Sequence, residues 1–413
     1  MLRSHSAAGQ HIATTGADAP DVVLKMVAMR AVGHWLLVQQ ALARRYHRRF
    51  RTRAPTTLQS RHAARRVDVI VTCYNEDPTL LEACCDSLMK QDYSGELNVY
   101  VVDDSSWNQR ELRAVMHRYR DLSNWNLKLL SSNVGKRRAQ DTVFRLGSGE
   151  LVMTLDSDTF LEPEAIARIA EAFCDQQVGV VTGSCMPLNV GRNLLTRLIS
   201  ARYSWLFAQQ RAAQSWFRAV LCCHGAFSAY RRSILTQCWD AYQHQVYRGV
   251  VCTTGDDLHL TNLVLAAGYD SLYAPPARGY TRVPETVREF ARQQLRWNRS
   301  FYRELSLTRR ALRGRSRYLM AEVVRQAVMP LAILTGLGIV AARLLDGAPW
   351  QLLDDVELAG VLLLVCAALV AWQTRTAYVC MYALFYLLLL PICVKAVITR
   401  GASRWETRRY PRS

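Results

Sequence analysis

The sequence predicts an α/β domain followed by a membrane module. Between residues 67 and 277, short apolar runs rich in β-branched residues alternate with helical patterns, which is typical of a mainly parallel sheet covered by helices. The last third contains three charge-free segments, residues 326–342, 358–374 and 376–394. Each is close to the roughly 20 residues that cross a bilayer as a helix. A buried core helix is the alternative, but three such segments in series favour three transmembrane helices.

The positive charge is unevenly distributed along the chain. The 413 residues include 52 Lys and Arg against 34 Asp and Glu, a formal net charge of +18. The excess lies in residues 44–66, 288–317 and 395–413, and the remainder is slightly acidic. Because these stretches border apolar segments and carry no nucleic-acid recognition motif, they favour a membrane surface over nucleic acid. The cysteines include no Cys-x-x-Cys pair, so neither a zinc site nor a disulfide framework is expected.

The expected elements begin with an N-terminal helix at residues 21–42. Charged residues interrupt its apolar pattern, so a surface-lying helix and a transmembrane helix both remain open. Strands are then expected at residues 67–72, 97–102, 127–130, 151–155 and 178–182. Helices are expected at residues 80–90, 163–174 and 258–267. Several strands run into acidic or polar loops, which is where ligands collect in parallel sheets.

The first two candidate loops follow the first two strands. The first strand leads into Tyr74, Asn75 and Glu76. The second ends in Asp103 and Asp104, whose carboxylates suit the base and ribose hydroxyls of a nucleotide as hydrogen-bond acceptors. An Asp/Ser turn or a helix cap explains the same two residues equally well.

The next two loops suit a diphosphate and its counter-ion. Gly135 and Lys136 stand at an expected helix start, where backbone N–H groups and an ammonium bind phosphate; a solvated basic helix start is the alternative. A further strand ends in Asp156 and Asp158. Residues two apart in a strand face the same side, so both carboxylates could hold one divalent cation that bridges a pyrophosphate.

The last candidate residues belong to two helices. Asp257 stands before an expected helix and suits a general base, although it could equally be a helix cap. Residues 284–305 form an amphipathic helix suited to a membrane surface. Its basic stripe consists of Arg288, Arg292, Arg296, Arg299 and Arg303. Gln293, Arg296 and Trp297 share one ridge and could enter a pocket together, whereas lipid phosphate is the alternative ligand of the arginines.

Taken in order, six motifs resemble those of the processive, membrane-bound family 2 glycosyltransferases. They read DVIVTCYNEDP, VVDDSS, NVGKRR, DSDT, GDD and QQLRW. No single motif is specific, but the ordered set is, and it covers the chain from about residue 67 to its C-terminus. The set is most similar to the branch that holds the rhizobial nodulation chitin-oligosaccharide synthases and the hyaluronan synthases.

The resemblance implies a GT-A (Rossmann-like) catalytic domain that uses a UDP-sugar with Mg²⁺ or Mn²⁺ and inverts the anomeric carbon. The residues that would hold uridine are Tyr74, Asn75, Glu76 and Asp104. Lys136 would hold the diphosphate, and Asp156 with Asp158 would hold UDP and the metal. Asp257 would be the general base. The leaving diphosphate would be stabilised, and the acceptor positioned, by Gln293, Arg296 and Trp297.

Two positions depart from the family pattern. The family usually has Gly-Pro where this chain has Gly225 and Ala226, near the expected acceptor site, so the choice of acceptor stays open. The usual Asp-Asp-Gly ends here in Ser105, which should only alter a turn.

The implied activity is transfer of N-acetylglucosamine from UDP-GlcNAc to a growing β-linked chain, as in chitin-oligosaccharide synthases. Hyaluronan synthesis from UDP-GlcNAc and UDP-GlcA is the alternative, and a non-processive transferase that adds one sugar to a lipid carrier is a third. The expected partners are the UDP-sugar donor, the growing oligo- or polysaccharide and membrane lipid, without nucleic acid.

The expected organisation has five parts. They are an N-terminal segment (1–66), the GT-A domain (67–283), an amphipathic interface region (284–318), three transmembrane helices (319–395) and a basic tail (396–413). The catalytic domain is expected in the cytoplasm, in a multi-pass protein of the plasma (inner) membrane. Three spans would place the basic tail outside, against the positive-inside rule, so its side stays open.

Overall fold

The computed structural model describes residues 19–52, 65–345, 381, 385 and 390–402. Its centre is an eight-stranded mixed sheet in the order β3-β2-β1-β4-β7-β6-β10-β5. The strands are β1 Val67–Cys73, β2 Leu97–Asp103, β3 Trp125–Leu129, β4 Leu151–Asp156, β5 Thr159–Leu161, β6 Val178–Pro187, β7 Phe227–Arg231 and β10 Asp270–Thr281. The first four strands are parallel, β7 runs antiparallel to β4 and β6, and β10 runs parallel to β6 and antiparallel to β5. Val246–Tyr247 (β8) and Val250–Val251 (β9) form a separate hairpin.

Helices cover both faces of this sheet. Because successive side chains of a strand point to opposite faces, Val69 and Val71 of β1 enter one hydrophobic core and Ile70 enters the other. The first core is covered by α2 Pro78–Met89, α3 Gln109–His117 and α5 Ala165–Ala172. The second is covered by α4 Lys136–Phe144, α8 Arg232–Gln243 and α9 Asp256–Ala266. Burial on both faces explains why these strands read as apolar runs rather than alternating patterns.

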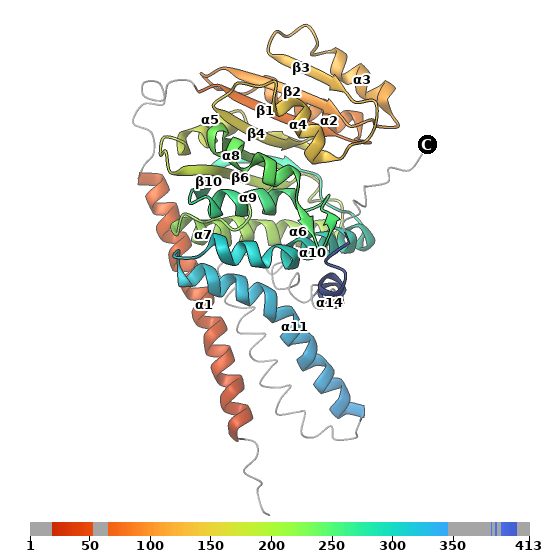
Figure 1. Cartoon of the computed structure of the whole chain (residues 1–413). Helices are drawn as coiled ribbons and strands as arrows, with labels where there is room; N and C mark the ends of the chain where they lie inside the picture. The colour runs from red at the N-terminus through yellow and green to blue at the C-terminus, as the bar shows by residue number, and fades with distance from the viewer. Residues whose placement is uncertain (1–18, 53–64, 346–380, 382–384, 386–389, 403–413) are drawn as a thin grey trace, which may run out of the picture.

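A second group of helices lies beside the sheet domain (Figure 1). It consists of α1 Ala19–Thr52, α6 Leu194–Trp205 with its π-helical continuation η1 Leu206–Arg211 and α7 Ala212–Trp216, α10 Val287–Ala311, α11 Arg317–Leu345 and α14 Leu390–Ile398. α1 and α11 extend away from the sheet at the same end of the molecule. They meet where Trp35 stacks on Tyr318 with ring centroids 4.5 Å apart.

The expected α/β class is confirmed, and all five expected strands are present. The sheet is mainly parallel, as expected, but β5 and β7 run against the other strands and make it mixed. The sequence patterns did not predict β5, β7 or β10. β10 contains Pro275 and Pro276, and its pairing with β6 shifts register between Tyr273 and Arg278. Proline removes a ladder donor and so weakens the strand pattern. The N-terminal helix is also longer than expected and reaches Thr52, inside the first basic stretch.

The structure bears on the membrane module only in part. Among the described residues, one helical stretch, Arg317–Thr335 of α11, is long and apolar enough to cross a membrane. It overlaps the first expected span. The second expected span lies outside the described residues, and the third reaches them mainly at its end, where α14 packs against α10. The three-helix module therefore stays a prediction.

The expected amphipathic helix is present as α10, but its basic stripe is not continuous. Arg303 is 4% exposed and donates to the carbonyl oxygen of Thr254. Arg303 is buried because α10 packs against other helices, α9 and α14, instead of lying free on a surface. Arg303 therefore binds protein, and a membrane-facing role for all five arginines is wrong.

Candidate active site

The loops after β1, β2 and β4 begin side by side at one edge of the sheet, because Cys73 pairs with Asp103 and Thr72 with Asp156. In the first loop Asn75 has a positive φ of 52°, which asparagine tolerates better than most residues. Its side-chain oxygen accepts from the N–H of Trp107 at 2.9 Å and so ties the first loop to the second.

Two neighbours of Asn75 complete the first loop. The carboxylate of Glu76 accepts from the hydroxyl of Ser157 at 2.8 Å, which ties this loop to the one after β4. Tyr74 is 37% exposed, so its ring is accessible from solvent. Three of the four residues predicted to hold uridine thus stand in a loop that is bonded to both neighbouring loops.

The two carboxylates after β2 have different surroundings. Asp103 accepts from the N–H of Ser106 at 3.1 Å, which fits the Asp/Ser turn considered above. Asp104 accepts from the N–H groups of Val134 and Gly135, both at 2.8 Å. Burial raises the pKa of Asp104, and these two N–H groups oppose the increase. Asp104 therefore stabilises the turn that leads into α4, and its predicted role in nucleotide binding stays a prediction.

Lys136 is the centre of a charged cluster that also contains Asp156, Asp256 and Asp257. It is the first residue of α4, directly after Gly135, whose φ of 86° places it in the left-handed region that glycine favours. Its ammonium lies 2.6 Å from Asp156 and 3.5 Å from Asp256. Burial opposes the charge, but attraction to the two carboxylates outweighs burial and raises the pKa of Lys136. Lys136 thereby joins α4, β4 and α9.

Asp156 and Asp158 flank the turn after β4. Asp156 keeps 38% of its side chain exposed, whereas Asp158 is buried and accepts from the hydroxyl of Thr281 at 3.1 Å. Within the described part of the chain, no group of three or more His, Cys, Asp or Glu residues is arranged to hold a metal. The two carboxylates predicted to hold a cation thus differ in exposure and in their partners, Lys136 for Asp156 and Thr281 for Asp158.

Asp256 and Asp257 open α9 rather than standing before it. Gly255, with a φ of 78°, is the N-cap. Asp257 accepts from the N–H of Leu258 at 2.8 Å and from that of Gly225 at 3.3 Å, so it does cap the helix in part. Burial and the charge of Asp256 raise the pKa of Asp257. Burial also opposes the charge on Asp256, but Lys136 outweighs burial and lowers its pKa.

α10 reaches the cluster through Arg296, whose positive charge contributes to lowering the pKa of Asp256 after those of Lys136 and Arg137. Trp297 is 43% exposed, and Gln293 is partly buried on the same helix. Both residues share the helix of Arg296, and their predicted role at the acceptor stays a prediction.

The same helix is fastened to the turn before α9. Arg303 donates to Thr254, and Glu304 lies 3.0 Å from the ring of His259. A Cβ atom at Gly255 would lie 2.5 Å from the Cβ of Ser300, so the turn and the helix touch closely. These contacts are not predictable from the sequence, because helix periodicity does not reveal which helix a face packs against.

Two further residues of the cluster escaped the sequence analysis. Asp256 stands next to the predicted general base, but its distance of 3.5 Å from Lys136 cannot be read from the sequence. Gly225 was noted only for the residue that follows it. Its N–H bonds Asp257, and a Cβ atom there would lie 3.1 Å from the ammonium of Lys136.

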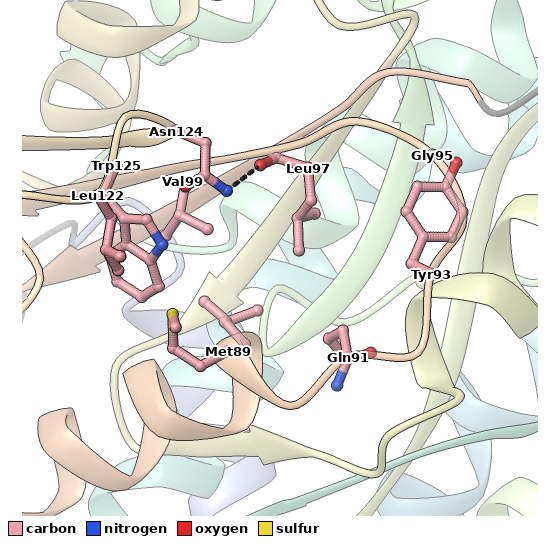
Figure 2. A pocket seen from close by; sticks show the side chains of 10 residues that line it. Met89, Gln91, Tyr93, Gly95, Leu97, Val99, Leu122, Asn124 and Trp125 are labelled. Carbon is pink, nitrogen blue, oxygen red and sulfur yellow. Dashed lines mark hydrogen bonds between the residues drawn. The ribbon is translucent and has the colours of Figure 1, made fainter.

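A cavity of about 260 Å³ lies elsewhere in the domain (Figure 2). Leu97 of β2 and Trp125 of β3 line it, so it stands at the amino ends of strands whose carboxyl ends carry the charged cluster. In Figure 2 the side chain of Asn124 donates to the carbonyl oxygen of Leu97 at 2.7 Å. None of the predicted site residues lines this cavity.

Known proteins resemble this chain in sequence. The family described as "Glycosyltransferase like family 2" matches residues 64–300. An N-acetylglucosaminyltransferase of Sinorhizobium fredii is 40% identical over 87% of this chain and 88% of its own length. One of Rhizobium leguminosarum bv. viciae is 39% identical over 83% of this chain and 81% of its own length. One of Azorhizobium caulinodans is 35% identical over 83% of this chain and 87% of its own length.

A solved structure resembles the fold. A mannosyltransferase of Pyrobaculum calidifontis, solved in complex with GDP-Man and Mn²⁺, superposes with a TM-score of 0.62 at 20% identity. The match covers 91% of this chain and 98% of that one. The mixed α/β sheet is therefore of the glycosyltransferase, GT-A-like type.

Proposed function

Because the chain belongs to glycosyltransferase family 2, we propose that it transfers N-acetylglucosamine from UDP-GlcNAc to the end of a growing β-linked chain, with inversion at the anomeric carbon. Relatives that are 35–40% identical over 83–87% of the chain carry the name N-acetylglucosaminyltransferase. The observation that carries the proposal is the single cluster in which Lys136, Asp156, Asp256 and Asp257 converge from three elements.

In the proposed reaction, Asp257 takes the proton from the acceptor hydroxyl as that oxygen attacks the anomeric carbon and UDP leaves. The raised pKa of Asp257 suits a base better than that of an ordinary aspartate, because proton transfer is most efficient near the working pH. Lys136 and Arg296 would meet the negative charge on the departing diphosphate. Tyr74, Glu76 and their loop would hold uridine beyond the tip of β1.

We infer the ligands of a divalent cation from the donor set. Mg²⁺ at phosphate sites usually takes one or two carboxylates, and Asp156 and Asp158 supply two. The solved mannosyltransferase contains Mn²⁺. A cation bound here would neutralise charge on the leaving diphosphate.

We further propose that the enzyme is anchored in the plasma membrane through α11, with the sheet domain on the cytoplasmic side. The apolar stretch Arg317–Thr335 and the neighbouring basic residues of α10 support this arrangement.

The test is a product assay. Membranes that contain the protein are incubated with UDP-GlcNAc alone or with UDP-GlcNAc plus UDP-GlcA, and the products are sized. We expect a β-linked GlcNAc oligomer from UDP-GlcNAc alone. A polymer formed only with both donors would identify a hyaluronan synthase instead, and a single added sugar would identify a non-processive transferase. Asp257→Asn is the inactive control and should lose transfer while still binding UDP.

A further inference from the structure

His224 lies beside the charged cluster but has no part in the reaction as described above. It precedes Gly225, whose N–H donates to Asp257 and whose Cα faces Lys136. The charges of Asp156 and Lys136 both act on its ring. The peptide that carries His224 therefore forms part of the wall around the reacting groups.

The protonation of the ring follows from its surroundings. Nε2 lies 3.0 Å from the carbonyl oxygen of Gly183. A carbonyl oxygen only accepts, so Nε2 carries the proton. Burial, together with the positive charges of Arg211 and Lys136, lowers the pKa of His224 to about 4, against the influence of Gly183 and Asp156. The ring is thus neutral at pH 7, and Nδ1 presents a lone pair.

This lone pair has no protein donor. Nδ1 is buried, and within the described part of the chain it has no hydrogen-bond partner. The ring is held in place, because Nε2 is bonded to Gly183 and Phe207 packs edge-on against it with centroids 5.4 Å apart. A fixed, buried acceptor next to the reacting groups costs free energy unless a ligand supplies an N–H or O–H group.

We propose that Nδ1 of His224 accepts a hydrogen bond from a hydroxyl or acetamido N–H of a sugar bound at the reaction centre. The inference rests on the proposed function, which places a sugar between Asp257 and the diphosphate. The sugar is either that of the donor or the terminal unit of the acceptor chain, since both carry such groups.

Two variants separate the two nitrogens of the ring. His224→Asn keeps an acceptor near the position of Nδ1 but loses the bond to Gly183. His224→Gln reaches Gly183 with its amide but lacks an acceptor near Nδ1. We expect His224→Gln to weaken sugar binding about fivefold to tenfold and His224→Asn to stay within about threefold of the natural protein. The affinity for UDP should be the same in all three proteins, which shows that the nucleotide site is intact.

Two measurements distinguish the source of the sugar. The ratio of the Kd values of UDP-GlcNAc and UDP reports the donor sugar, and the KM of an added chitin oligosaccharide at saturating UDP-GlcNAc reports the acceptor. A selective increase in either one for His224→Gln supports the proposal and names the source. Normal behaviour of His224→Gln, or equal losses in both variants, would overturn it. Failure of the natural protein to transfer GlcNAc would instead contradict the proposed function, whatever the variants do.

Discussion

Asp256 and Asp257 are adjacent carboxylates that differ in their partners. Asp256 faces the ammonium of Lys136 at 3.5 Å, whereas Asp257 faces backbone N–H groups and the charge of Asp256. The result is one carboxylate with a lowered pKa and one with a raised pKa. Two neighbouring acids with separated pKa values are suited to two roles, here a permanent counter-charge for Lys136 and a proton acceptor.

The pH dependence of the reaction should therefore follow Asp257. A base acts in its ionised form, so activity should fall as the pH drops through the raised pKa of Asp257. Asp256→Asn removes the like charge that, after burial, is the largest cause of that increase. The acid limb of the profile of kcat/KM against pH should therefore move to lower pH, even where the overall rate falls.

The control for this prediction is Asp240→Asn. The side chain of Asp240 is 93% exposed and lies outside the cluster, so its loss changes the net charge equally but should leave the acid limb in place. An unchanged limb in Asp256→Asn would show that another group sets it.

At the residue scale, Lys136, Asp156 and Asp257 were predictable from the sequence, because polar residues after buried strands or at helix starts form a visible pattern. Asp256 and His224 were not, because their roles depend on distances to Lys136 and Gly183 across the fold. The role of Arg303 was misjudged for the same reason. Helical spacing placed it on the basic stripe, and only the packing of α10 on α9 shows that it is buried.

At the element scale, the start of α9 depends on its contact with α10. Gly255 adopts a φ of 78°, and its Cα lies against Ser300. Buried polar contacts extend this interface, since Asn262 of α9 donates to Thr308 of α10 at 2.9 Å. The orientation of Asp257 is therefore coupled to the helix that carries Arg296.

Gly255→Ala should disturb this coupling. A non-glycine residue at such a φ costs about 1–2 kcal/mol, and overpacking against Ser300 adds roughly 1–3 kcal/mol. Gly249→Ala is the matched control, because Gly249 has the same φ of 78° but no atom within 4 Å of its Cβ position. We expect a larger loss of thermal stability and of transfer in Gly255→Ala than in Gly249→Ala.

Ser300→Gly in the same chain should recover part of the loss, because it removes the atoms that the new methyl group meets. Equal effects of Gly255→Ala and Gly249→Ala would show that the backbone conformation, and not the contact with α10, makes glycine necessary.

A strand was predictable from the sequence where its own residues form a recognisable pattern. Both faces of β1 and β2 are buried, so their apolar runs identify them. β7, with the sequence FSAYR, has no β-branched residue, and β10 is interrupted by two prolines. These strands are held in the sheet by long-range pairing with β4 and β6, which no local pattern reveals.

At the scale of the whole molecule, the C-terminal segment touches the helix that carries the predicted acceptor residues. Arg299 of α10 donates to the hydroxyl of Thr399 at 2.9 Å, and Phe290 packs near Phe385 with centroids 5.8 Å apart. These contacts lie on both sides of Arg296 and Trp297 in the sequence. The position of the QQLRW motif therefore depends on residues about 100 positions later in the chain, as the separation of Arg299 and Thr399 shows.

Overpacking the buried face of α14, which packs against α10 and α11, should impair transfer without disturbing the nucleotide site. Ala396 of α14 is fully buried, so Ala396→Phe has to displace a neighbouring helix, whereas Ile398 is 76% exposed and Ile398→Phe does not. A shift of about 1 Å in catalytic groups can cost 100-fold in rate, so we expect Ala396→Phe to lower kcat about 10- to 100-fold. UDP binding should be unchanged, because α14 packs against α10 and α11, whereas the loop that would hold uridine is tied to the loops after β2 and β4. Equal rates for the two variants would show that α14 serves only to anchor the chain, and a parallel loss of UDP binding in Ala396→Phe would indicate general unfolding.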